Sequence, residues 1–268
     1  MPPERTEYET ACASFSLAAG AACLALRLLQ NHIGFEVDTR LPVPGSLPAL
    51  LLPLLLLLSA AALIFLTRRL PRSTEAPFSA QFGGADAKCL TLTVLGCFLV
   101  GLSGVWELLR AVSGGQAVLS ADGLSVIASV GSGTSGAIMG VLSIAAAAGL
   151  FCGLLACRKE TVSPLPLLAV PVSLLIRLVF VYRLDSVDPV LAHYYPELLG
   201  LMALILGSYR LSGFTVKAGN PRLFTLYTGL SVICSLTLLA DGITPAACLT
   251  LGGAAALAGF CWTMREAA

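Results

Sequence analysis

Charged side chains are scarce in this chain of 268 residues: they make up 12% of it, against about 25% in an average soluble domain. With 57% hydrophobic residues and a mean hydropathy of +0.88, the chain has too little charge to cover the surface of a soluble globule. It also lacks the basic surface of a nucleic-acid-binding protein and the polar composition of a disordered chain. The composition therefore indicates a polytopic membrane protein that lies in a lipid bilayer and has no nucleic-acid partner.

Several motifs of enzymes and metalloproteins are also missing. The nine cysteines form no Cys-x2-Cys pair, and two histidines, His32 and His193, are too few for a histidine-built zinc site. The sequence has no Gly-x4-Gly-Lys-Ser/Thr phosphate-binding loop and no His-Glu-x2-His motif. A Gly-x-Ser-x-Gly nucleophile motif is missing as well. We therefore predict neither a metal site nor a cofactor.

What the sequence has instead is long apolar runs. Eight of them are each long enough to cross a bilayer, which takes roughly 20 apolar residues in a helix. Each run is apolar around its whole circumference, as a helix embedded in lipid should be. The sequence thus predicts an all-α bundle of transmembrane helices that forms one integral membrane domain over residues 1–268. The predicted spans are 11–30, 47–66, 89–109, 135–157, 164–182, 190–209, 223–240 and 246–264.

Lysine and arginine are unevenly divided between the two predicted sides of the membrane. Eleven of them, from Arg5 to Arg265, fall in loops and termini on one side, whereas the opposite loops hold only Arg40, Arg110 and Arg183. Cytoplasmic loops are enriched in these residues, and the alternation holds at every loop. The pattern predicts a multi-pass protein of the plasma membrane with both termini in the cytoplasm.

A weak internal repeat suggests two four-helix halves in the same orientation. Arg27 is followed eleven residues later by Asp38, and Arg177 is followed eleven residues later by Asp188. Transporters often show such internal symmetry, although chance matches in a low-complexity apolar chain give the same pattern. The two halves would be residues 1–160 and 161–268.

Ionisable side chains inside the spans are the strongest functional signal, because each costs roughly 2.5–3.5 kcal/mol at the bilayer centre. Arg177 and Glu197 lie at similar depth in adjacent antiparallel spans. We expect them to form a buried ion pair, which either serves a substrate or proton site or fixes helix register. His193 lies one helical turn before Glu197, beside Tyr194 and Tyr195. These three residues either complete the site or form an interfacial belt at the headgroups.

Two further charges are placed in the same outer half. Glu107 lies near the outer end of the third span, three residues before Arg110, and the two either form a local pair beside the aromatic anchor Trp106 or contribute to a site. Arg27 lies near the outer end of the first span, where it either reaches Glu107 or extends to the surface. We predict that several spans converge on an outward-facing polar cavity. Its candidate binding residues are Arg27, Glu107, Arg177, His193, Tyr194, Tyr195 and Glu197.

Three functional interpretations follow. The first is a binding or transport protein for a small anionic or zwitterionic molecule or a lipid headgroup, and the outer cluster of charges favours it. The second is a non-catalytic subunit or scaffold that packs against a partner membrane protein. The third is a membrane-embedded lipid-modifying enzyme, which the short loops and the lack of a carboxylate or histidine constellation disfavour.

Two local patterns concern packing. Small residues recur four apart on the fourth and eighth spans, at Gly136 and Gly140 and at Gly252 and Ala256. Such faces allow close approach of helices, and we prefer contacts within the chain to a dimer. The connector 67–88 is basic and then polar, which is typical of a flexible loop that touches anionic lipid.

Cysteine labelling tests the predicted orientation. With the native cysteines removed and Ala121→Cys placed in the outer loop, a membrane-impermeant maleimide should label intact cells. Label that reaches position 121 only from the cytoplasmic side would contradict the predicted topology with both termini in the cytoplasm.

Overall fold

The computed structural model is a bundle of long helices. It describes residues 4–35, 43, 46–74, 76–83, 87–113, 132–157, 163–185 and 191–266. Most of the predicted outer loop 111–134 lies outside these ranges. Within them, eight helices are long and apolar enough to cross a membrane. They are α1 (Glu4–Ile33), α2 (Leu47–Thr67), α4 (Ala87–Val112), α5 (Ser132–Ala156), α6 (Leu165–Asp185), α7 (Leu191–Gly213), α8 (Pro221–Leu238) and α9 (Pro245–Glu266).

The eight predicted spans are therefore confirmed, and the protein is an all-α multi-pass membrane protein. The predicted ends are mostly within a few residues of the helix ends, and the largest difference is at α1, which starts at Glu4 rather than at residue 11. These first seven residues, 4–10, are mostly polar, so a search for apolar runs does not include them.

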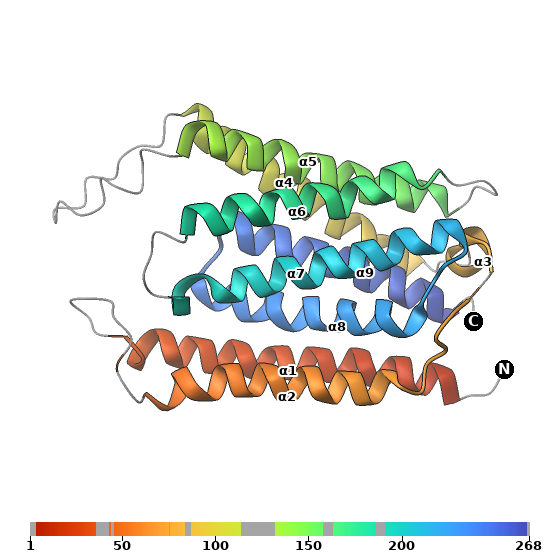
Figure 1. Cartoon of the computed structure of the whole chain (residues 1–268), viewed down its shortest axis with the longest axis horizontal. Helices are drawn as coiled ribbons and strands as arrows, with labels where there is room; N and C mark the ends of the chain where they lie inside the picture. Colours follow the sequence, from red (N-terminus) through yellow and green to blue (C-terminus); the bar gives the residue numbers. More distant parts are fainter. Residues whose placement is uncertain are drawn as a thin grey trace.

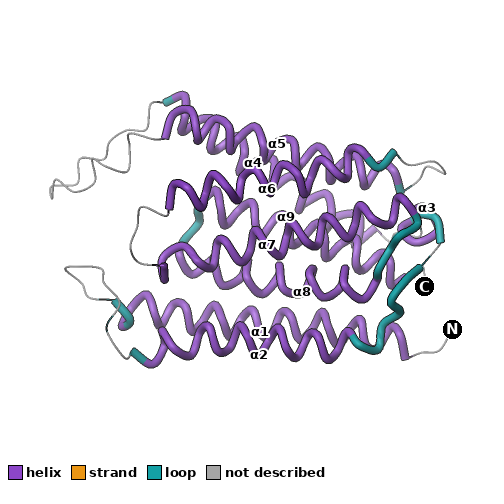
Figure 2. Tube along the Cα trace, in the orientation of Figure 1, coloured by secondary structure: helices purple, strands orange, loops and turns teal. Residues whose placement is uncertain are grey.

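The helices run side by side, with connections only at the two ends of the bundle (Figures 1 and 2). Both termini lie at one end. We call the opposite end, where α1, α4, α6 and α8 finish, the distal end. In Figure 1, α4, α5 and α6 form one side of the bundle and α1 and α2 the other, with α7, α8 and α9 between them. α1 packs on α2 and α8, while α4 packs on α5 and α9.

Glycine contacts set the spacing of α4 from its two neighbours. A Cβ added to Gly252 of α9 would lie 2.8 Å from the Gly96 carbonyl oxygen of α4. A Cβ added to Gly140 of α5 would lie 2.8 Å from the Gly104 carbonyl oxygen of α4. Backbones approach this closely only where side chains are absent. The small-residue faces thus make contacts within the chain, as predicted.

The connector after α2 is anchored, so the prediction of a flexible loop is wrong for its described part. It contains the short helix α3 (Phe78–Phe82), whose two phenylalanines are buried. The Phe82 ring packs edge-to-face on Phe214 and Phe260, with centroids 5.3 and 5.8 Å apart. The Thr74 amide also donates to the Gly219 carbonyl at 3.0 Å. The two phenylalanines, four residues apart, bury a large apolar area. This burial anchors the segment although the residues around them are polar.

The turn between α8 and α9 places a carboxylate at the distal end. α8 continues into the short 3-10 helix η3 (Leu239–Asp241), and Gly242 follows with φ of 99°. An L-residue with a side chain rarely adopts this conformation, so glycine allows the sharp reversal here. The Thr244 hydroxyl then accepts from the Ala247 amide at 3.1 Å and caps the start of α9.

The two-half organisation, 1–160 and 161–268, stays a prediction. α6 packs between α5 and α7, whereas α1 packs on α2 and α8. The helices that carry Arg27 and Arg177, α1 and α6, would correspond in such a repeat, but they have different sets of neighbours.

Substituting a glycine at a helix contact should destabilise the bundle. Gly96→Ala would place a methyl group 2.8 Å from the Cα atom of Ala256, and we expect a loss of about 1–3 kcal/mol of unfolding free energy from overpacking. Gly101→Ala on the same helix is the control. Its methyl group would lie 3.7 Å from Ala147 Cβ, which is an ordinary contact, and the substitution raises helix propensity by the same amount. Thermal unfolding in detergent compares them. Equal melting temperatures would argue against the tight α4–α9 contact.

Candidate functional site

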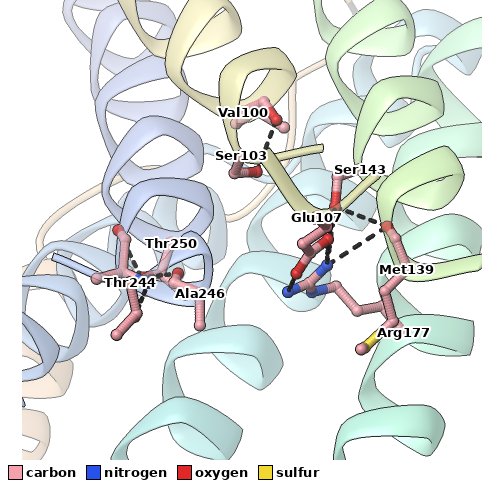
Figure 3. Close-up of polar contacts among 10 residues, drawn as sticks. Val100, Ser103, Glu107, Met139, Ser143, Arg177, Thr244, Ala246 and Thr250 are labelled. Carbon is pink, nitrogen blue, oxygen red and sulfur yellow. Dashed lines mark hydrogen bonds and ion pairs between the residues drawn. The ribbon is translucent and has the colours of Figure 1, made fainter. Parts of the chain in front are cut away.

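A buried ion pair joins α6 to α4 in the distal half of the bundle (Figure 3). Arg177 Nη1 donates to Glu107 Oε2 and Nη2 donates to Glu107 Oε1, both at 2.6 Å. The Arg177 side chain is 2% exposed and that of Glu107 is 9% exposed. Paired N–H groups that face the two oxygens of one carboxylate form the strongest geometry available to an ion pair. The two opposite charges therefore compensate each other in the bundle interior.

Helix α5 completes this cluster through a hydroxyl and a carbonyl. Arg177 Nη1 also donates to Ser143 Oγ at 2.8 Å and lies 3.4 Å from the Met139 carbonyl oxygen. The Ser143 hydroxyl is itself 2.9 Å from that carbonyl, and 3.4 Å from Glu107 Oε2. Three consecutive spans, α4, α5 and α6, are thus tied together at one depth (Figure 3).

A second ion pair joins α1 to η3. Arg27 Nε donates to Asp241 Oδ1 at 2.9 Å, and Nη2 donates to Oδ2 at 3.2 Å. Arg27 Nη1 donates to Gln30 Oε1 at 3.1 Å, and the Asn31 side chain donates to Asp241 Oδ1 at 2.9 Å. The side-chain exposures differ: 2% for Arg27 and 24% for Asp241. A buried cation here has a counter-ion at the edge of the bundle.

Tyr195 of α7 lies in the same part of the bundle as this second pair. Its ring packs against the apolar cluster formed by α1, α2 and α8. It is within electrostatic range of both Arg27 and Asp241. Its hydroxyl oxygen is buried and has no hydrogen-bond partner among the described residues. A buried hydroxyl without a partner is uncommon, because it forfeits the hydrogen bonds it makes in water.

The structure pairs the predicted charges differently from the sequence analysis. Arg177 pairs with Glu107, so the predicted Arg177–Glu197 pair is wrong. The prediction matched depth along adjacent helices but not rotation about the helix axis, which aims Arg177 at α4 and α5. Arg27 neither reaches Glu107 nor extends to the surface; it pairs with Asp241.

Asp241 is the site residue that the sequence analysis missed. It directly follows the predicted span 223–240 and therefore lies outside the residues in which intramembrane charges are sought. The available signal was its position: a carboxylate at the end of a span, near the predicted depth of an arginine that still needed a partner.

The remaining candidates lie on α7. Tyr194 and Glu197 are half-buried, four and seven residues into the helix. His193 belongs to the first turn of the same helix, and its side chain lies outside the described part of the structure. The seven predicted residues thus share the distal half of the bundle, where they divide between two ion-pair clusters and the start of α7.

Within the described ranges, no group of three or more histidine, cysteine, aspartate or glutamate side chains could hold a metal ion. Neither a protein-family model, nor a curated protein, nor a solved structure matches the chain. The class that fold and composition define is a multi-pass membrane protein, with eight candidate spans among the described residues.

A double-mutant cycle tests the Arg177–Glu107 pair. Arg177→Leu should lose about 3–5 kcal/mol of unfolding free energy, because it leaves Glu107 as a buried charge without its partner. Combining it with Glu107→Leu should recover much of that loss. Thermal unfolding in detergent gives the coupling energy.

The same cycle on Arg177 and Glu197 is the control. Its two losses should add, since the two residues do not pair. Additive losses for Arg177 and Glu107 would show that the ion pair does not form in the folded protein.

Proposed function

We propose that the protein is a binding or transport protein for a small anionic or zwitterionic molecule or a lipid headgroup, which it takes up at the distal end. The supporting observation is the exposure difference within the Arg27–Asp241 pair. The cation is 2% exposed, but its counter-ion is 24% exposed. An anion arriving at this end meets a guanidinium whose present partner is within reach of solvent.

Ligand exchange at this pair follows from the chemistry of guanidinium. Its planar donors fit carboxylate and phosphate oxygens equally well, so an incoming anion competes with Asp241 for Arg27. The ammonium group of a zwitterion would then bind the displaced Asp241 carboxylate. The Tyr195 hydroxyl, which has no hydrogen-bond partner among the described residues, would supply a further hydrogen bond.

The side of the membrane follows from the distribution of positive charge. We propose that the protein lies in the plasma membrane with both termini in the cytoplasm, so that the distal end faces outward. The site would then receive its ligand from outside the cell.

The role of a non-catalytic subunit is the second candidate, and helix α2 supports it. Of its most apolar stretch, 17% is buried, less than in any other of the eight spans. Leu54, Leu57 and Leu58 are more than half exposed. This face suits either lipid tails or a helix of a partner membrane protein.

A thermal stability screen of the purified protein in detergent tests the ligand-binding proposal. The panel contains succinate, glycine, glycerol phosphate, phosphocholine and phosphoethanolamine. A ligand that binds only the folded protein, at a hundred times its Kd, should add about 2.7 kcal/mol of stability. Arg27→Gln should abolish that gain, whereas Arg110→Gln should keep it, since Arg110 is exposed and stacks on Trp106 at the same end.

Asp241→Asn separates the two ligand classes. Removing the competing carboxylate should strengthen binding of a pure anion, whereas it should weaken binding of a zwitterion that needs Asp241 for its ammonium group. No stabilisation across the panel, or equal stabilisation in wild type and Arg27→Gln, would overturn the proposal and favour the subunit role.

A further inference from the structure

The guanidinium of Arg177 has donors left over after its contacts with the described residues are made. A guanidinium presents five N–H groups in one rigid plane. Nη1 uses its two on Glu107 and Ser143, and Nη2 uses one of its two on Glu107. Nε is buried without an acceptor among the residues that the structure describes. The Nε–H and the second Nη2–H lie on the same edge of the plane, which we call the open edge.

The open edge is suited to an anion with two oxygens. Glu107 occupies the end of the guanidinium, through Nη1 and Nη2, and the adjoining edge offers the same paired-donor geometry. The side chain that carries it is 2% exposed. An unused pair of donors on so deeply buried an arginine is costly unless an acceptor occupies it at some stage.

The charge balance around the pair restricts what binds there. Arg177 and Glu107 cancel each other, and α5 contributes only the Ser143 hydroxyl and the Met139 carbonyl. An added anion would give this cluster a net negative charge in a poorly solvated interior, which is strongly unfavourable. Neutrality is restored if one proton is bound together with the anion.

The other ionisable groups on the packed helices are placed less favourably for that proton. On α4 and α6, Arg110 and Arg183 are exposed cations nearer the distal end. On α7, Tyr195 lies in the same part of the bundle as the Arg27–Asp241 pair, and Tyr194 and Glu197 are half-buried. On α9, Cys248 is half-buried. Glu107 is the carboxylate that already contacts Arg177, so it is the group that an anion on Arg177 affects most.

We propose that the open edge of Arg177 binds the carboxylate of a small organic acid and that Glu107 takes up one proton in the same event. The proton comes from water and forms one O–H bond on Glu107; no other covalent bond changes. Arg177 keeps its charge, now balanced by the ligand instead of Glu107. The net process adds a neutral acid to the buried cluster.

This inference concerns a different set of helices from the Arg27–Asp241 site. It involves α4, α5 and α6, whereas the distal pair involves α1 and η3. It therefore stands or falls separately from the proposed function, and the two are distinguished by substituting one arginine at a time.

Calorimetric titration of the purified protein in detergent with acetate, butyrate and benzoate tests the proposal. Titrations in two buffers of different ionisation enthalpy give the number of protons taken up. We expect one proton per acid bound, and an affinity for the acid that rises as the pH is lowered. Binding without proton uptake overturns the proposal, and so does failure of all three acids to bind, which would leave water as the occupant of the open edge.

Three variants assign the effect to residues. Glu107→Gln should bind the acids without proton uptake and with affinity that no longer depends on pH, because the cluster then starts with a net positive charge. Arg177→Lys should lose binding at least tenfold, because an ammonium group lacks the paired donors of the open edge. Arg110→Gln is the matched control for loss of a distal cation and should behave as wild type.

Arg27→Gln separates this site from the distal one. Proton-linked binding that is lost in Arg177→Lys but kept in Arg27→Gln assigns it to the open edge. The reverse result overturns this inference and leaves the proposed function standing. If Glu107→Gln does not fold, Glu107→Asp is measured instead. We then expect one proton per acid bound, as in the wild type, and a weaker affinity for the acid.

Discussion

A guanidinium buried inside a membrane-spanning bundle needs a counter-ion, and much of the distal half is arranged to provide one. Such a charge cannot be left without a partner, because desolvation costs several kcal/mol per ion. Arg27 and Arg177 each meet this demand with a carboxylate from another helix, bound through two nitrogens. A carboxylate can do so only if its helix brings it to the right depth and rotation. The positions of α4, α6 and η3 are therefore coupled to these two contacts.

The two ion pairs also bear on how the chain is divided. Arg27 and Glu107 belong to residues 1–160, and their partners Asp241 and Arg177 belong to residues 161–268. Each pair thus links one predicted half to the other. The opposite end of the bundle is held by different forces, through the Phe82, Phe214 and Phe260 rings. One end is fixed by charge and the other by aromatic packing, with glycine contacts of α4 between them.

Sequence reasoning reaches the fold because each span is specified locally. A run such as 47–66 is apolar on every side, and its length fits a bilayer whatever its neighbours are. The ion pairs are not local. Depth can be read from the sequence, and it placed Arg177 and Glu107 in the same half; the partner depends on helix rotation and on which helices adjoin, which only packing decides. Asp241 and the anchored α3 were missed for the same reason, since each gains its role from contacts with helices distant in sequence.

The two clusters differ chiefly in access to solvent, and this difference separates their chemistry. Asp241 is 24% exposed, so water can stabilise it when an anion displaces it from Arg27. Glu107 is 9% exposed and, apart from Arg177, its hydrogen-bond partner among the described residues is the Ser143 hydroxyl. On the proposals above, the exposed pair exchanges one anion for another, whereas the buried pair stays neutral by binding an anion together with a proton. On these two proposals the Arg27–Asp241 pair selects its ligand by charge, whereas the Arg177–Glu107 cluster binds an anion only when Glu107 takes up a proton.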